Sequence, residues 1–210
     1  QIQAIGLASE WGWHLQAVAA AAKKGLFNDY PLLYPRPYDR AVRDASKFTG
    51  LSPELIYAVI RQESLYQADA GSRAGARGLM QLMPATARRT AKRWDQPAPT
   101  NVRLLDPATN VRLGAATLAS LVRRADQQVP LALAGYNAGP AAARRWLPDA
   151  PLETDVWVEN IPYNETRGYV RRVYWHSLVF GWLEDRQPQD VKHWITRTWR
   201  PAADAALQPR

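Results

Sequence analysis

The hydrophobic positions of this chain recur mostly three and four residues apart, which is the spacing of helices with one buried face. We find no sustained alternation of apolar and polar residues and no Asn-Gly turn, the usual signals of strands and hairpins. The pattern therefore predicts an all-α fold. Helices are expected over 1–22, 39–48, 52–66, 83–94, 106–127, 131–137, 141–146 and 164–184.

Local signals mark several of these boundaries. Ser52-Pro53 and Asp106-Pro107 each place a capping side chain before a proline, which is tolerated at the first helical position. Residues 69–78 contain three glycines and are expected to form a loop. Residues 28–37, rich in proline and tyrosine, are expected to be a connector, and the tail from Gln187 one more helix.

Glu63 stands out within the helix predicted for residues 52–66. Ile56, Val59 and Ile60 recur at helical spacing, and Glu63 is the next position on that apolar stripe. A carboxylate on a buried face is desolvated, so it tends to keep its proton toward neutral pH and can serve as an acid. The alternative is a fraying last turn with Glu63 in solvent, which is the commoner situation for a lone glutamate.

Glu63 belongs to the first of four sequence blocks. The blocks are Arg61-Gln62-Glu63-Ser64, Gly78-Leu79-Met80-Gln81-Leu82-Met83-Pro84, Gly135-Tyr136-Asn137-Ala138-Gly139-Pro140 and Glu159-Asn160-Ile161-Pro162-Tyr163-Asn164-Glu165-Thr166-Arg167-Gly168-Tyr169-Val170. Together they resemble the signature of the soluble lytic transglycosylases, which cleave bacterial peptidoglycan with a lysozyme-like domain. The fourth block points to the large soluble branch. The resemblance spans roughly residues 47–185 and implies a lysozyme-like (goose-type-like) helical domain.

The resemblance also implies a domain organisation. Residues 1–46 would be the remnant of a helical linker domain, 47–185 the catalytic domain, and 186–210 a C-terminal helical tail that packs on it. The chain begins with Gln1 rather than methionine, so we expect a processed piece of a longer protein that lacks its signal peptide. The family would place it in the bacterial periplasm.

The reaction that the resemblance implies needs one catalytic carboxylate. Most glycosidases use two, and substrate-assisted enzymes are the exceptions. The blocks offer only Glu63, and in the resembled family the acetamido oxygen of N-acetylmuramic acid takes the place of the second carboxylate. Glu63 would act first as acid and then as base toward the C6 hydroxyl of the sugar, which leaves a 1,6-anhydromuramyl end. The expected class is a carbon–oxygen lyase that acts on glycan strands of peptidoglycan.

Six further residues are implied to bind substrate: Ser72, Gln81, Met83, Tyr136, Asn137 and Glu165. Most have structural alternatives. Ser72 fits an ordinary turn, Met83 fits core packing, and Asn137 is expected to act mainly on the fold around it. Glu165 fits the first turn of the last long helix. Tyr169, one turn later, fits either the groove or the core.

The amino-acid composition limits the kinds of ligand and partner that are expected for this chain. The net charge is +8 and 22 of the 27 basic residues are arginines, but they are dispersed over separate helices, which disfavours a nucleic-acid binder. The positive charge reflects either solvated helix faces or attraction to an anionic cell wall. There are no cysteines, only three distant histidines and no Asp-x-Asp loop, so no metal or other cofactor is expected. The weakly charged stretch 1–22 is interrupted by polar residues, so no integral membrane segment is expected.

The sequence leaves two other functions open. A goose-type lysozyme-like hydrolase would use water in place of the C6 hydroxyl and would need a second carboxylate, for which Asp69 is the nearest candidate in the sequence. A non-catalytic cell-wall-binding module would be expected to lack Glu63, which is present.

Overall fold

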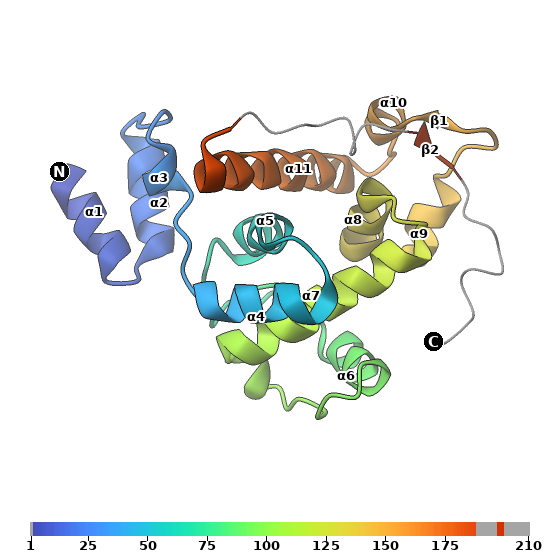
Figure 1. The fold of residues 1–210 in the computed structure, drawn as a ribbon, viewed down its shortest axis with the longest axis horizontal. Coiled ribbons are helices and arrows are strands. Elements are labelled where there is room, and N and C mark those ends of the chain that lie inside the picture. The colour runs from blue at the N-terminus through green and yellow to red at the C-terminus, as the bar shows by residue number, and fades with distance from the viewer. Residues whose placement is uncertain (1, 188–196, 200–210) are drawn as a thin grey trace.

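The structure is a computed structural model of the 210-residue chain, and it describes residues 2–187 and 197–199. Helices dominate the described residues, so the predicted all-α fold is confirmed (Figure 1). The elements are α1 Ile2–Glu10, α2 His14–Lys23, α3 Tyr30–Leu33, α4 Asp39–Thr49, α5 Pro53–Ser64, α6 Pro84–Arg93, the 3-10 helix η1 Arg103–Leu105, α7 Pro107–Arg124, α8 Val129–Ala138, α9 Pro140–Arg145, β1 Leu152–Glu153, α10 Thr154–Glu159, α11 Asn164–Asp185 and β2 Arg197–Thr198.

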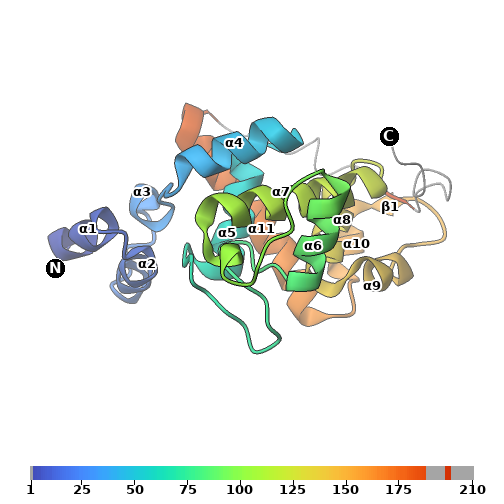
Figure 2. The ribbon, with the colours of Figure 1, turned by 90° about the horizontal axis from the view of Figure 1, so that it is seen from below.

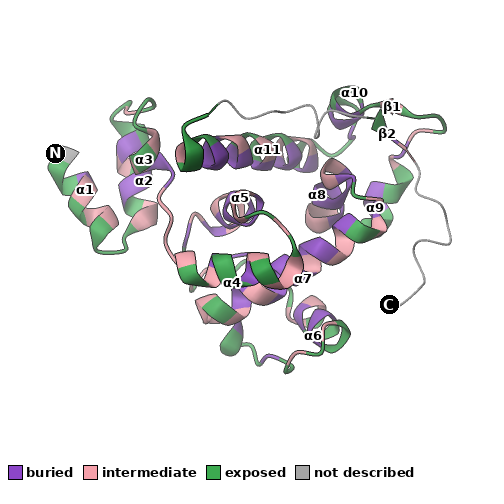
Figure 3. Ribbon diagram, in the orientation of Figure 1, coloured by how far each residue is buried: buried purple, intermediate pink, exposed green. Residues whose placement is uncertain are grey.

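Helix α5 occupies the centre of the molecule. Every residue from Leu55 to Ile60 is buried, so this helix is enclosed on all sides. Helix α11 packs along one side of it, and α4, which itself packs on α7, lies on the other (Figures 1 and 3). Burial of these six consecutive side chains stabilises the position of α5 in the core through the hydrophobic effect.

The N-terminal region differs from the prediction of one helix over residues 1–22. The structure has two helices, α1 and α2, separated at Trp11–Trp13. Gly12 adopts a φ of +80°, a left-handed conformation that ends α1 and that glycine adopts without steric cost. Together with α3, which lies within the predicted connector, these helices form a lobe at one side of the molecule (Figure 1). The predicted boundary between residues 46 and 47 falls inside α4, and the division into domains remains a prediction.

The C-terminal part also departs from the sequence pattern. Strands β1 and β2 form a two-residue antiparallel pair, Leu152 with Thr198 and Glu153 with Arg197, and α10 was not predicted. Where a helical tail was expected, the described residues 197–198 are a strand, and most of the tail lies outside the described residues. Gln128 holds this strand, since its side-chain amide accepts from the backbone N–H of Trp199 at 3.0 Å and donates to the Trp199 carbonyl at 3.2 Å. A two-residue ladder is too short to produce an alternating pattern.

Within the described part of the chain, no helix has both the length and the apolar character that a membrane span requires.

Candidate functional site

Glu63 lies in the last turn of α5, where the local sequence places it. The helix begins as predicted, with the Ser52 hydroxyl accepting from the backbone N–H of Leu55 at 3.3 Å and Pro53 at the first helical position. It ends at Ser64, because Leu65 adopts a left-handed φ of +47°. The Ser64 hydroxyl donates to the Ile60 carbonyl within the helix, so its structural role is clear.

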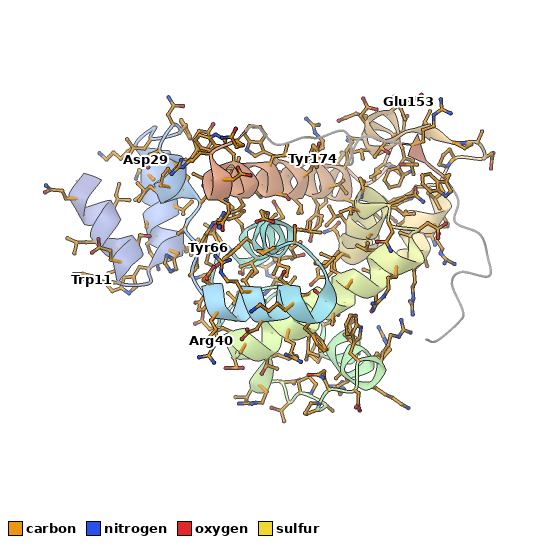
Figure 4. The ribbon with its side chains drawn as sticks, viewed as in Figure 1. Trp11, Asp29, Arg40, Tyr66, Glu153 and Tyr174 are labelled. Carbon is orange, nitrogen blue, oxygen red and sulfur yellow. The ribbon has the colours of Figure 1, made fainter. Side chains whose placement is uncertain are left out.

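The residue after this stop anchors the helix end. Tyr66 is buried, its φ is +69°, and its ring packs edge-on against His14 of α2 at 6.0 Å between centroids. Figure 4 shows Tyr66 between α5 and the N-terminal helices, whereas Trp11 and Arg40 lie at the outside. Glu63 therefore precedes a well-anchored turn, and the alternative of a fraying last turn is wrong.

A pocket of about 520 Å³ opens at this end of α5. Its lining residues come from the α5 terminus, the following loop and α11: Arg61, Gln62, Glu63, Ser64, Leu65, Gln67, Ala70, Gly71, Ser72, Gln81, Arg172 and His176. Glu63 is half-buried in its wall. The carboxylate is thus accessible to a ligand in the pocket while most of its surroundings are protein.

The environment of Glu63 is that of an acid that titrates near neutrality. Burial raises the pKa of Glu63 from 4.5 to about 7 because the charged form is desolvated. The hydroxyl of Tyr169 donates to Glu63 Oε1 at 2.8 Å and opposes this rise, since it stabilises the carboxylate. The negative charge of Glu165 raises the pKa further.

Two tyrosines flank the acid, Tyr169, which is buried, and Tyr136, which is half-buried. Tyr169, on α11, is the one that contacts it directly, and it was not among the predicted binding residues. A signal was present, because Tyr169 follows Glu165 by four residues and so shares its helix face. The hydroxyl of Tyr136 instead donates to the Met80 carbonyl at 2.8 Å. Burial and the charge of Glu63 hold the pKa of Tyr136 well above its usual value, so the two side chains are close.

Residues from the loop between α5 and α6 form one side of the pocket, and Figure 2 shows this loop extending away from the helices. Ser72 is exposed, and its hydroxyl accepts from the backbone N–H of Ala76 at 3.0 Å, as a turn serine does. Gln81 has a left-handed φ of +44°, and its side-chain amide donates to the carbonyls of Ala70 at 3.2 Å and Gly78 at 2.9 Å. Gln81 thereby ties the loop together and also borders the pocket.

Asn110 of α7 holds the base of the loop and was not predicted. It is fully buried; its carbonyl accepts from Met80 N at 2.8 Å, and its amide donates to the carbonyls of Arg77 at 2.9 Å and Leu104 at 2.7 Å. Gly78 is required beside it, because a Cβ there would lie 2.3 Å from Asn110 Nδ2 and its φ is +74°. The side chain of Asn110 makes all three of these hydrogen bonds with backbone groups, and it thereby fixes the position of the sequence block that contains Gln81.

A second pocket, of about 480 Å³, continues from the first along α6 and α8. Gln81 lines both pockets, so we treat them as one groove. Met83, Tyr136 and Asn137 all line the second part. Met83 is 42% exposed, which excludes core packing for it, whereas Met80 is fully buried.

Asn137 connects α8 to the first turn of α11. Its amide nitrogen donates to Glu165 Oε1 at 3.4 Å, and its carbonyl accepts from the Thr166 hydroxyl at 2.6 Å. Glu165 is exposed and lies in the first turn of α11, as predicted. Asn137 thus orients Glu165, whose charge acts on Glu63.

The pocket that contains Glu63 also carries positively charged side chains. Arg61 and Arg172 line it together with His176. Burial, and then the charges of Arg61 and Arg172, lower the pKa of His176 to about 3, so this imidazole is neutral. Its Nδ1 lies 3.0 Å from the Tyr34 hydroxyl. Sequence reasoning missed these three residues as pocket residues, although Arg61 stands in the first block.

A comparison with known families identifies the domain. Residues 40–153, more than half of the chain, match the transglycosylase SLT domain. The chain belongs to this family. The SLT domain match includes Glu63, the loop and α8, but it ends before α11, which provides Tyr169 and Glu165.

Relatives and solved structures agree with this assignment. The chain is 31% identical over 191 residues to the soluble lytic murein transglycosylase of Escherichia coli. The aligned residues cover 90% of this chain and 29% of that protein. It superposes on an inactive mutant of the lytic transglycosylase Slt from Pseudomonas aeruginosa with a TM-score of 0.83 and 36% identity, covering 88% of this chain and 30% of that one. The 70 kDa soluble lytic transglycosylase of Escherichia coli gives a TM-score of 0.82 at 28% identity, covering 93% and 32%. The predicted lysozyme-like fold is confirmed.

This chain thus spans about 29% of the length of the soluble lytic murein transglycosylase of Escherichia coli. Among residues 2–187 and 197–199, no group of three or more His, Cys, Asp or Glu side chains is placed to hold a metal ion.

Proposed function

We propose that this chain is the catalytic part of a peptidoglycan lytic transglycosylase in which Glu63 is the single acid and base. The observation that carries the proposal is the carboxylate of Glu63, half-buried in the pocket wall with a pKa of about 7, on a domain of the transglycosylase SLT family. An acid with a pKa near the working pH is both protonated often enough to donate and basic enough to accept a proton. The substrate would be glycan strands at the cell wall, in the periplasm.

In the first step, protonated Glu63 gives its proton to the oxygen of the β-1,4 bond between N-acetylmuramic acid and N-acetylglucosamine. As that C–O bond breaks, the acetamido oxygen of the muramic acid residue bonds to its own C1, which replaces the carboxylate nucleophile of two-carboxylate enzymes. The N-acetylglucosamine portion leaves with a hydroxyl, and Glu63 is left ionised. The Tyr169 hydroxyl, 2.8 Å from Oε1, stabilises that ionised form.

In the second step, the ionised Glu63 takes the proton of the C6 hydroxyl of the same sugar. The C6 oxygen bonds to C1, the acetamido oxygen leaves C1, and a 1,6-anhydro ring forms. No water is consumed, and Glu63 is returned to its protonated state. A hydroxyl of the same ring competes well with water because its effective concentration is high.

For the alternative of a hydrolase, the structure favours a different second carboxylate from the one that the sequence suggested. Asp69 is exposed. Burial raises the pKa of Tyr38, and the negative charge of Asp69 raises it further, so Asp69 acts on Tyr38. The second carboxylate near the acid is Glu165, whose charge raises the pKa of Glu63. If this chain used water, Glu165 rather than Asp69 would be the first residue to test as its base. A non-catalytic wall-binding module has no need of a carboxyl group with a pKa near neutrality in its groove.

The experiment is digestion of purified sacculi with mass spectrometry of the products. The anhydro product is lighter by one water than the reducing-end product of hydrolysis. Wild type should release anhydro ends, Glu63→Gln should lose activity by on the order of 10²–10⁴-fold, and Glu54→Gln, in the first turn of the same helix, should be active. In the Pseudomonas aeruginosa structure, a glutamine in place of one glutamate is likewise an inactive mutant. Reducing ends as the main product would refute transglycosylation, and an active Glu63→Gln would refute the single-acid mechanism.

A further inference from the structure

Arg172 lines the same pocket of about 520 Å³ as Glu63, yet neither step of the proposed reaction uses it. It lies on α11 three residues after Tyr169, whose hydroxyl contacts the acid. Residues three apart share a helix face, and the rise between them is about 4.5 Å. Arg172 is therefore placed about one turn from the acid, along the same wall of the pocket.

Two features of the structure fix the position of the Arg172 guanidinium group. Its Nε donates to Oε1 of Gln62 on α5 at 2.9 Å. Gly168, one turn earlier on α11, leaves room for the same group, because a Cβ there would lie 2.8 Å from Arg172 Nη1. The guanidinium group thus rests over the backbone of its own helix and is tied to the next one. A side chain supported in this way has a defined position in the pocket wall.

Most of the hydrogen-bonding capacity of Arg172 is unused by the protein. A guanidinium group has five N–H donors, and the bond to Gln62 uses one of them. Among residues 2–187 and 197–199, Nη1 and Nη2 of Arg172 have no hydrogen-bond or ion-pair partner. The arginines that form ion pairs there are Arg36, Arg40, Arg43, Arg171 and Arg197. Arg172 is exposed, so its free donors are open to a ligand in the pocket.

The neighbouring side chains on this part of the pocket wall do not supply a negative charge that would engage these donors. His176, one turn further along α11, is neutral, because burial and the charges of Arg61 and Arg172 lower its pKa to about 3. Arg61 also lines the pocket and has a charge of the same sign as Arg172. The free donors of Arg172 are therefore available to whatever occupies the pocket.

A glycan strand carries the matching acceptors. Its sugars have hydroxyl and acetamido oxygens, which are neutral, and a hydrogen bond from a charged donor contributes more than one between two neutral groups. Glu63 lines the pocket of about 520 Å³ and is not part of the lining of the other half of the groove. A strand whose cleaved bond lies at Glu63 thus brings a sugar next to that bond into the pocket that Arg172 lines.

We propose that Arg172 is a further substrate-binding residue, whose Nη1 and Nη2 donate to hydroxyl and acetamido oxygens of a sugar adjacent to the cleaved bond. Gln62 and Gly168 are positioning residues, because they act on the sugar through Arg172. The proposal rests on the proposed function, since it takes the glycan strand as the ligand. Arg172 contributes affinity for the strand and leaves the acid unchanged, because its charge is not among the causes that shift the pKa of Glu63.

Three variants test this site in a Glu63→Gln background, in which turnover does not interfere with binding. Arg172→Gln removes the charged donors. Gly168→Ala keeps Arg172 but places a methyl group where its guanidinium group rests. Arg171→Gln is the matched control, because this exposed neighbour pairs with Glu159 at 3.4 Å and lines neither part of the groove.

The probe is a tetrasaccharide of alternating N-acetylglucosamine and N-acetylmuramic acid without peptide, and its lactyl carboxyl groups are capped as amides. Calorimetry measures its affinity for each variant. The capped tetrasaccharide has no charge, so general attraction between an anion and a positively charged protein does not contribute to the result.

Arg172→Gln should lower the affinity about tenfold or more, since hydrogen bonds from a charged donor are lost. Gly168→Ala should also lower it, and the double variant should bind no more weakly than Arg172→Gln alone, because both changes act on one group. Arg171→Gln should bind as the parent does. An unchanged affinity in Arg172→Gln, an equal loss in Arg171→Gln, or no binding by the parent would overturn the proposal.

Urea unfolding separates a contact with the ligand from a role in packing. Alanine is favoured over glycine within a helix, so Gly168→Ala should be at least as stable as the parent while it binds the probe more weakly. A loss of stability that accompanies the loss of affinity would assign the contact between Gly168 and Arg172 to packing and overturn the proposal. Failure of the proposed function would appear separately, as an absence of anhydro products from wild type on sacculi.

Discussion

The hydrogen bond between Tyr169 and Glu63 provides a sharp test of how the acid is tuned. Tyr169→Phe removes the hydroxyl that donates to Glu63 Oε1 at 2.8 Å and leaves the buried ring in place. A donor to a carboxylate stabilises its charged form, so this bond holds the pKa of Glu63 below the value that burial alone would produce. The pKa should therefore rise above about 7 in the variant.

The size of the shift follows from the energy of the bond. A hydrogen bond to a charged group contributes about 1.5–3 kcal/mol, and one pKa unit corresponds to about 1.4 kcal/mol. The loss of the bond would thus raise the pKa by about one to two units. Glu63 is half-buried and borders a pocket that water can enter, so a water molecule would replace part of the interaction. We expect a rise of about one unit.

The assay is kcat/KM for peptidoglycan cleavage as a function of pH, which reports the pKa of the acid in the free enzyme. Wild-type activity should fall as pH rises through about 7, and the fall in Tyr169→Phe should lie at higher pH. Tyr136→Phe is the matched control, because the Tyr136 hydroxyl donates to the Met80 carbonyl rather than to Glu63. A decline at the same or lower pH in Tyr169→Phe would refute this account of the acid.

Three further predictions concern stability and the loop. The folded-state pKa of Glu63 is raised, so its contribution to stability is complete below pH 4.5 and is lost as pH rises through about 7. Glu63→Gln should therefore gain up to about 3 kcal/mol over wild type between pH 4.5 and pH 8, measured by urea unfolding at both pH values; an equal difference at the two pH values would contradict this. Asn110→Ala should destabilise the protein by at least about 3 kcal/mol in urea unfolding, because three backbone groups lose their partner and two of the three hydrogen bonds are buried. A loss below about 1 kcal/mol would show that the loop is held by other contacts. Ser72→Ala should reduce turnover of sacculi less than Glu63→Gln does, because it removes at most a neutral hydrogen bond of about 0.5–1.5 kcal/mol. Unchanged turnover would leave Ser72 as the turn residue that its bond to Ala76 N describes.

The sequence by itself determined the features that depend on neighbouring residues. The starts of α5 and α7 follow from Ser52-Pro53 and Asp106-Pro107, whose side chains accept from backbone N–H groups three residues later. The position of Glu63 on a buried stripe was readable because helix periodicity decides which face a residue occupies. Such signals are local, and for this reason they survive without knowledge of the fold.

Only the tertiary structure decided which groups act on Glu63. Tyr169 is 106 residues away in the sequence and reaches the acid because α11 packs along α5. Nothing in the sequence distinguishes Asn110 from other polar residues of α7. Its role depends on the fold, which places three backbone groups within hydrogen-bond distance of its side chain. The break at Gly12 and the short pairing of β1 with β2 also left no usable pattern. Periodicity tells which face of a helix is buried, but the partner on that face is chosen by packing between segments that are distant in the chain.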